Sequence, residues 1–112
     1  MNQPTGTGFA EDRAVQGLQQ EVLAAMRAGM GFATAHKEGG THLFYNGRVF
    51  VREDYGDQPN IRETYPSDEA MIKCLRQFHD WNARRDGYPE QPSELAVWQY
   101  IRSRLVRQRP AG

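Results

Sequence analysis

Residues 31–55 read GFATAHKEGGTHLFYNGRVFVREDY, and two turn signals divide this alternating run into three short strands. The signals are Gly39-Gly40 and Asn46-Gly47. Asn-Gly suits a two-residue type I′ turn, because both central positions of that turn need a positive φ. Strands that are joined by two-residue turns are antiparallel. The stretch therefore predicts a three-stranded antiparallel meander.

Helical patterns flank the meander on both sides. Before it, apolar residues recur at helical spacing over residues 11–28 and predict one amphipathic helix. After it, Ser67 and Ser93 each begin a helix, because a serine hydroxyl accepts hydrogen bonds from the first free amides of a helix. We expect these two helices within residues 67–84 and 93–109.

The remaining segments complete a prediction of an α+β fold. Residues 60–65, NIRETY, predict a possible short fourth strand. Residues 1–9 are small and polar, so we expect a disordered leader there. Residues 10–109 are expected to form one α+β domain, with an N-terminal helix, the meander and two C-terminal helices.

Composition narrows the class of protein. The chain has 112 residues, with 14 basic and 14 acidic side chains and a formal net charge of zero, so nothing in it demands a polyanionic partner. Its single cysteine, Cys74, cannot form an internal disulfide, and a reducing cytoplasm is the simplest location. No apolar run approaches the roughly 18 residues of a membrane span, so no membrane partner is expected.

The register of the meander predicts which side chains share a face. With two-residue turns, Tyr45 lies opposite Arg48 and Leu43 lies opposite both Phe50 and His36. One face then carries small and branched residues, and we expect helices to pack on it. The predicted core is Phe44, Val49, Val51, Leu18, Val22, Leu75, Phe78, Trp98 and Ile101.

The other face of the meander combines aromatic rings with guanidinium groups. Tyr45, Arg48, Phe50 and Arg52 are predicted to form an outward platform on which rings stack while the arginines hold an anion. The alternative is that a helix covers this face and the arginines lie at its rim in ordinary cross-strand pairs. Burial of Phe50 distinguishes the two interpretations.

A short motif around His42 points to a second class of function. Gly40-Thr41-His42, with the apolar residues and the Gly-Arg hairpin that follow, resembles the Gly-Ser/Thr-His segment of the HicA toxin family. The likeness covers about residues 21–51. It implies a small ribonuclease with a double-stranded-RNA-binding-domain-like α-β-β-β-α fold, in which His42 is the catalytic residue. The alternative is a histidine at the end of a core-facing strand, bonded to backbone or to a carboxylate.

No cofactor or metal ion is expected. His36 and His42 fall on opposite faces of the predicted sheet and cannot share a zinc ion. Cys74 and His79 point roughly 140° apart on one helix, which is poor geometry for a shared metal or an activated thiolate.

Arginines gather near the C-terminus, after the last acidic residue, Glu94. They either form an edge that binds phosphate or another anion, or stabilise the negative end of the last helix dipole. The residues are Arg102, Arg104, Arg107 and Arg109.

Two function classes follow from these patterns. The first is a non-enzymatic module that binds a protein or a nucleic acid through the strand face or a groove beside it. The second is a metal-independent ribonuclease with His42 as general acid or base and Arg48 or Lys37 stabilising phosphate charge. The sequence favours the first and leaves the partner and the oligomeric state open.

Overall fold

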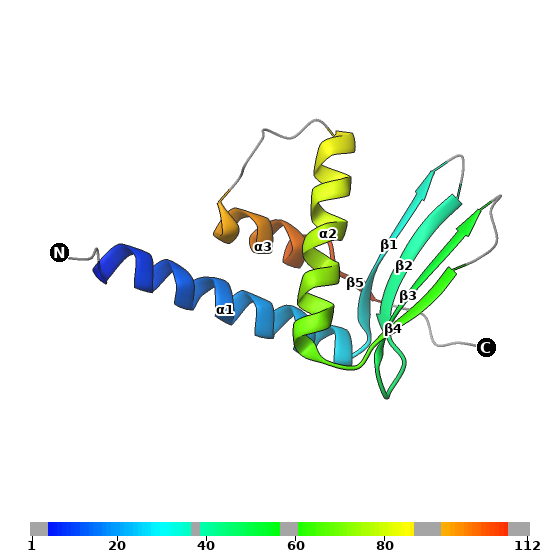
Figure 1. The fold of residues 1–112 in the computed structure, drawn as a ribbon, viewed down its shortest axis with the longest axis horizontal. Coiled ribbons are helices and arrows are strands. Elements are labelled where there is room, and N and C mark those ends of the chain that lie inside the picture. Colours follow the sequence, from blue (N-terminus) through cyan, green and yellow to red (C-terminus); the bar gives the residue numbers. More distant parts are fainter. Residues whose placement is uncertain (1–4, 37–38, 57–60, 87–92, 108–112) are drawn as a thin grey trace.

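The computed structural model describes residues 5–36, 39–56, 61–86 and 93–107. Its helices and strands follow one another along the chain as Figure 1 shows. In order they are α1 (Thr5–Arg27), β1 (Met30–His36), β2 (Gly39–Tyr45), β3 (Phe50–Gly56), β4 (Ile61–Tyr65), α2 (Asp68–Asp86), α3 (Glu94–Ser103) and β5 (Val106–Arg107).

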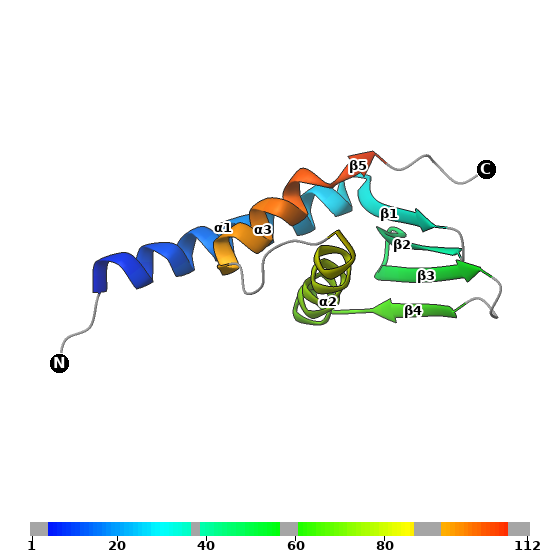
Figure 2. The same ribbon diagram turned by 90° about the horizontal axis from the view of Figure 1, so that it is seen from above.

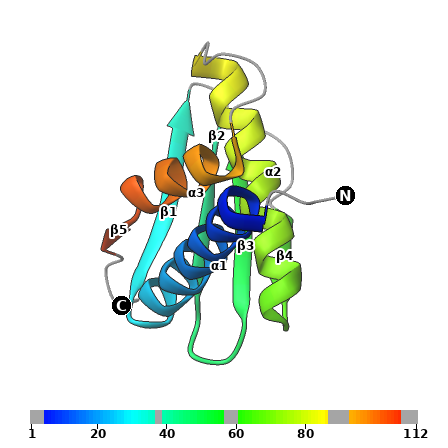
Figure 3. The ribbon, with the colours of Figure 1, turned by 90° about the vertical axis from the view of Figure 1, so that its left-hand side faces the viewer.

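The strands form one antiparallel sheet with helices on one side of it. The strand order is β4-β3-β2-β1-β5. Seen from above and from the helical side, all three helices lie on the same side of the sheet, and no described element covers the opposite side (Figures 2 and 3). The predicted α+β class is therefore confirmed, with an N-terminal helix, an antiparallel sheet and two further helices.

The sheet has more strands than the sequence predicts. The possible fourth strand is present as β4, which pairs along β3. A fifth strand was not predicted: β5 pairs Val106 with Gly31 and Arg107 with Met30 at the edge of β1. It replaces the end of the predicted third helix, because α3 ends at Ser103 and the chain then extends along β1.

The hairpin between β2 and β3 differs from the predicted two-residue turn. Tyr45 pairs with Phe50, so residues 46–49 form the loop and the register shifts by two residues. The Asn46 side chain explains the longer loop, since its Oδ1 accepts hydrogen bonds from the backbone N–H groups of Arg48 and Val49, both at 2.9 Å. Gly47 has a φ of 98°, which fits its glycine identity.

The turn predicted at Gly39-Gly40 is also displaced. Both glycines lie within β2, where Gly39 pairs with His36, and residues 37–38, which connect the two strands, lie outside the described part. Phe32 is consequently the residue opposite Leu43, four positions from the predicted partner. The two registers differ from the predicted ones by two and by four residues, both even numbers. They leave each side chain on its predicted face, because strand side chains alternate with a period of two.

The core, however, lies on the face that was predicted to point outward. Phe32, Leu43 and Phe50 are buried beneath the helices, at 2%, 0% and 2% exposure. Phe44 and Val49 are only partly buried, and Val51 is buried outside the helix-side cluster, between Phe44 and Thr64 of the neighbouring strands. The large rings fill the space between sheet and helices, which smaller side chains would leave unpacked.

The helical part of the predicted core is mostly confirmed. Val22, Leu75, Trp98 and Ile101 are buried, while Leu18 and Phe78 are partly buried and pack against the same cluster. The first helix begins at Thr5, inside the predicted leader. In Figures 1 and 2 α1 and α3 run side by side in the same direction, and Arg102 Nε of α3 lies 2.7 Å from Glu21 Oε2 of α1.

Candidate functional site

The structure does not bring the four predicted platform residues together on one outward surface. Phe50 lies in the core, and its ring is tilted against that of Tyr45 at a centroid distance of 5.0 Å. The guanidinium of Arg27 covers both rings, 4.9 Å from the centre of Phe50 and 5.6 Å from that of Tyr45. The expected stacking of arginine on these rings exists, but the arginine comes from α1 of the same chain and also pairs with Asp68. Placing Phe50 on an exposed face was wrong.

The two predicted arginines are also separated. Arg48 is exposed in the loop between β2 and β3. Arg52 lies within β3, opposite Leu43 on the helical side of the sheet, and lines a pocket. Of the predicted residues, only Arg52 therefore belongs to the site described below.

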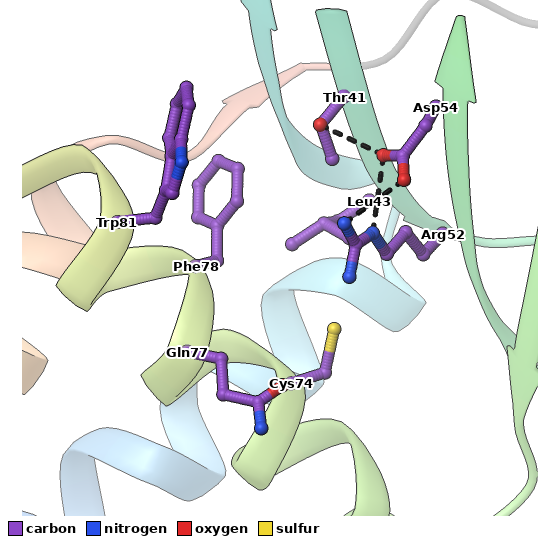
Figure 4. Close-up of a pocket in the computed structure, with 8 residues that line it drawn as sticks. All are labelled: Thr41, Leu43, Arg52, Asp54, Cys74, Gln77, Phe78 and Trp81. Carbon is purple, nitrogen blue, oxygen red and sulfur yellow. Dashed lines mark hydrogen bonds and ion pairs between the residues drawn. The ribbon is translucent and has the colours of Figure 1, made fainter. Parts of the chain in front are cut away.

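The pocket opens between strands β2 and β3 on one side and α2 on the other. Its volume is about 360 Å³. Figure 4 shows Phe78 and Trp81 projecting from α2 on one side and the polar side chains of the two strands on the other. The lining residues are Thr41, Leu43, Arg52, Asp54, Cys74, Gln77, Phe78 and Trp81.

The strand wall carries an ion pair with a hydroxyl group. Arg52 and Asp54 are two apart on β3 and so share a face, with Nε to Oδ1 at 3.1 Å and Nη2 to Oδ2 at 2.9 Å. Thr41, directly opposite Asp54, donates its hydroxyl to Oδ1 at 2.9 Å. Burial alone would lower the pKa of the Arg52 guanidinium, but the bond and charge of Asp54 outweigh it and raise that pKa. This wall is therefore polar and neutral in net charge.

The helix wall is mainly apolar and ends in an exposed ring. Cys74, Gln77, Phe78 and Trp81 recur at three- and four-residue intervals, so they lie on one face of α2. Phe78 packs on Phe32 of the core at a centroid distance of 5.6 Å. Trp81, one turn further on, stays 48% exposed and is one of the two large apolar residues that the described part leaves exposed. An exposed indole beside a pocket marks a candidate contact surface.

Cys74 lies at the inner end of the pocket, and its thiol is not activated. It is 5% exposed, and burial raises the pKa of its thiol, although the Tyr65 hydroxyl and the Arg52 charge act in the opposite direction. Burial and the neighbouring Cys74 also raise the pKa of the Tyr65 phenol. At neutral pH both groups keep their protons, so this site lacks an activated thiolate.

A second, shallower hollow continues the pocket along α2. It is lined by Tyr65, Ser67, Glu69, Ala70, Lys73, Cys74 and Gln77, with a volume of about 430 Å³. Cys74 and Gln77 belong to both hollows. We refer to the two together as the α2 groove.

Sequence reasoning missed the helix side of this groove. Neither Trp81 nor Gln77 is among the site residues that the sequence predicts. A signal was available, since Trp81 continues the Cys74–Phe78 stripe at a position where the helix runs past the core. The pocket itself depends on how the helix and sheet diverge, which no local pattern encodes.

His42 lies elsewhere, on the side of the sheet that faces away from the helices. It is partly buried, and its ring is stacked on that of Phe44 at a centroid distance of 4.5 Å. Its cross-strand neighbours are Ala33 and Glu53. Arg48 comes after the end of β2, and the three residue steps from His42 to Tyr45 already span about 10 Å. The structure does not join His42 and Arg48 in one site, and Lys37 lies outside the described residues, so the ribonuclease remains a prediction.

Comparisons with known proteins add no relative. No family model, no curated protein and no solved structure matches this chain. Within the described segments, no group of three histidine, cysteine or acidic side chains is placed to hold a metal ion. None of the helices there combines the length and apolar character that crossing a membrane requires.

Proposed function

We propose that this protein is a small non-enzymatic binding module whose α2 groove holds an extended segment of another protein. One observation carries the proposal: the shallow hollow and the deeper pocket share Cys74 and Gln77, and the deeper pocket lies beside the exposed ring of Trp81. Pockets lined mainly by apolar and aromatic side chains, with a few fixed polar groups, are typical of recognition sites.

The length of the groove suits a peptide. From Glu69 to Trp81 it follows α2 for roughly 18 Å, at 1.5 Å of rise per residue. An extended chain advances about 3.3 Å per residue, so five or six residues fill this length.

The charge of the groove favours a protein segment over a nucleic acid. Arg52 is neutralised by Asp54, and Lys73 is accompanied by Glu69 in the shallow hollow. Binding to a nucleic acid draws most of its affinity from cations that neutralise successive phosphates. A groove of balanced charge lacks the cations that would neutralise successive phosphates. It is compatible with the backbone amides and uncharged side chains of a protein segment.

The deep pocket defines the anchor of the segment. Leu43 and Phe78 form its apolar walls and Trp81 flanks its opening, so an apolar or aromatic side chain of the partner fits there. The carboxylate of Asp54 and the guanidinium of Arg52 are positioned to bind the partner's backbone. Tryptophan and arginine are the side chains that most often dominate binding energy at such contacts.

Selection from a library of displayed random peptides, followed by fluorescence-polarisation titration of a selected peptide, tests the proposal. We expect Trp81→Ala to weaken binding by roughly tenfold or more. Gln99→Ala, which alters an exposed side chain of α3 away from the groove, is the control and should bind like the wild type. Equal affinity of Trp81→Ala and wild type, with both folded, would refute the proposal.

Arg48 and Arg52 separate the groove from the platform predicted from the sequence. Arg52→Ala should weaken binding of the selected peptide, because it removes one member of the pocket's polar wall. Arg48→Ala should leave the affinity unchanged, because the Arg48 side chain is exposed on a loop that does not line the groove. A loss of affinity on both substitutions would favour the platform.

A further inference from the structure

A second pocket, of about 370 Å³, lies between β1, α2 and the end of α3. Phe78 lines this pocket as well as the first one and stands between them, with its ring on Phe32. Thr34 and the buried Ile101 contribute to its other walls. We call it the α3 pocket. It shares no polar residue with the α2 groove, so its role is independent of the function proposed above.

The α3 pocket differs from the α2 groove in its charge. Arg104 and His79 line it, and among the described lining residues there is no carboxylate. Beside this pocket, Asp80 Oδ1 lies 3.2 Å from the imidazole Nδ1 of His79, and Arg76 pairs with both Asp80 and Glu94. The positive charge that lines this pocket therefore comes from Arg104.

Arg104 lies where it can bind an anion in this pocket. Its guanidinium lies 5.3 Å from the ring centre of Tyr100, and the side chain is exposed at the pocket. The other arginine of this part of the chain, Arg102, is engaged with Glu21, whereas no described carboxylate forms an ion pair with Arg104. An exposed guanidinium binds carboxylate or phosphate oxygens in pairs through its planar donors.

Asn82 supplies a second recognition group. It is 1% exposed, and its Nδ2 donates to the backbone carbonyl of Phe78 at 2.8 Å. This bond fixes the orientation of the amide, since a carbonyl can only accept. The Oδ1 atom is buried and has no hydrogen-bond partner among the described residues. Buried acceptors are normally satisfied, so a donor from a bound molecule fits here.

We propose that the α3 pocket binds a small organic anion. A carboxylate or phosphate group lies on Arg104, a flat apolar body packs between Phe32 and Ile101, and a hydroxyl or N–H group of the ligand donates to Asn82 Oδ1. The volume accommodates a molecule of the size of a substituted benzene ring.

Titration with four probes, followed by amide chemical shifts, tests this site. The probes are 4-hydroxybenzoate, phenyl phosphate, uncharged 4-hydroxybenzamide and inorganic phosphate. We expect the two aromatic anions to shift the amides of Thr34, Asn82 and Ser103 and to saturate. The uncharged amide and inorganic phosphate should bind at least tenfold more weakly, because each lacks one of the two recognised parts. Comparison of phenyl phosphate with benzoate, which both lack the 4-hydroxyl group, identifies the preferred acidic group.

Substitution of Arg104, which follows the end of α3, and of Arg102 in its last turn gives the decisive comparison. Arg104→Gln should weaken 4-hydroxybenzoate at least tenfold and leave 4-hydroxybenzamide unchanged, whereas Arg102→Gln, the matched control, should stay within twofold of wild type. Asn82→Leu, if it folds, should abolish the preference for 4-hydroxybenzoate over benzoate. Equal affinity of Arg104→Gln and wild type for 4-hydroxybenzoate, or no saturable shift with either aromatic anion, would overturn the proposal.

Discussion

Single side chains decide which face of the sheet the helices cover. Phe50 and Leu43 fill the space beneath the helices, and Arg27 closes the edge of this layer by stacking on Phe50 and Tyr45. Phe44, one residue along β2, points to the other side and stacks on His42. The sequence pattern predicted which residues share a face. It did not predict which face is buried, because both carry aromatic and aliphatic side chains and the choice depends on packing with helices distant in the chain.

Truncation of Phe50 and of Phe44 tests which face of the sheet is buried. Phe50→Ala should lower the free energy of unfolding by about 3–5 kcal/mol, because it leaves a cavity in the core. Phe44→Ala should cost clearly less, because its ring is partly exposed on the outer face. Urea denaturation of both variants against wild type provides the comparison. A larger loss for Phe44→Ala than for Phe50→Ala would contradict the observed burial.

The protonation of Cys74 predicts a dependence of stability on pH. Burial raises the pKa of the thiol in the folded protein, so folding favours the protonated form. The resulting stabilisation is complete below the ordinary thiol pKa of about 8.5 and is lost as the pH rises through the folded value.

Denaturation curves of wild type and Cys74→Ala between pH 7 and pH 9.5 test this dependence. The difference in the free energy of unfolding between the two proteins should shift against the wild type as the pH increases. Burial, the largest cause of the raised pKa of Tyr65, is present in both proteins, so the phenol contributes in the same direction to both. A difference that stays constant with pH would show that the thiol is not shifted.

At the level of elements, the hairpins show how much of a turn its sequence signal predicts. Asn46-Gly47 correctly marks a reversal of the chain, yet the Asn46 side chain bonds two backbone amides and extends the loop to four residues. The helix starts are better encoded: Ser67 and Ser93 both accept from amides three residues on, as the sequence predicts. β5 could not be predicted, because a two-residue strand exists only through its pairing with β1.

The positive φ of Gly47 in the hairpin loop leads to a prediction about stability. Gly47→Val should destabilise the protein, because a β-branched residue is strained at a φ of 98°, although a Cβ there would meet no neighbouring atom. Gly17→Ala is the matched control: its added Cβ is likewise unobstructed, and within α1 alanine favours the helix. We expect a lower melting temperature for Gly47→Val and no decrease for Gly17→Ala. An unchanged melting temperature of Gly47→Val would rule out the positive φ.

Considered as a whole, the molecule is a sheet with helices on one side, in which α2 and the strands leave two pockets on either side of Phe78. The first has a polar wall of balanced charge and an exposed indole, and the second is lined by Arg104, which pairs with no described carboxylate. Arg52 is the one predicted site residue that lines the first. Thr41, Leu43 and Asp54 line it from the strands as well, and its other side comes from α2. The position of α2 relative to the sheet is set by the packing of Phe78 on Phe32 and of Met71 and Leu75 in the core.

Amide chemical-shift mapping of a selected peptide on the isotope-labelled protein tests the central claim, that the α2 groove is the binding surface, most directly. The predicted result is that the largest shifts occur at Arg52, Lys73, Gln77 and Trp81, including the indole N–H of Trp81, with small shifts at Phe44 and Thr64 of the outer face. Shifts concentrated at Phe44 and Thr64, with those of α2 unchanged, would contradict the claim and place binding on the open face of the sheet.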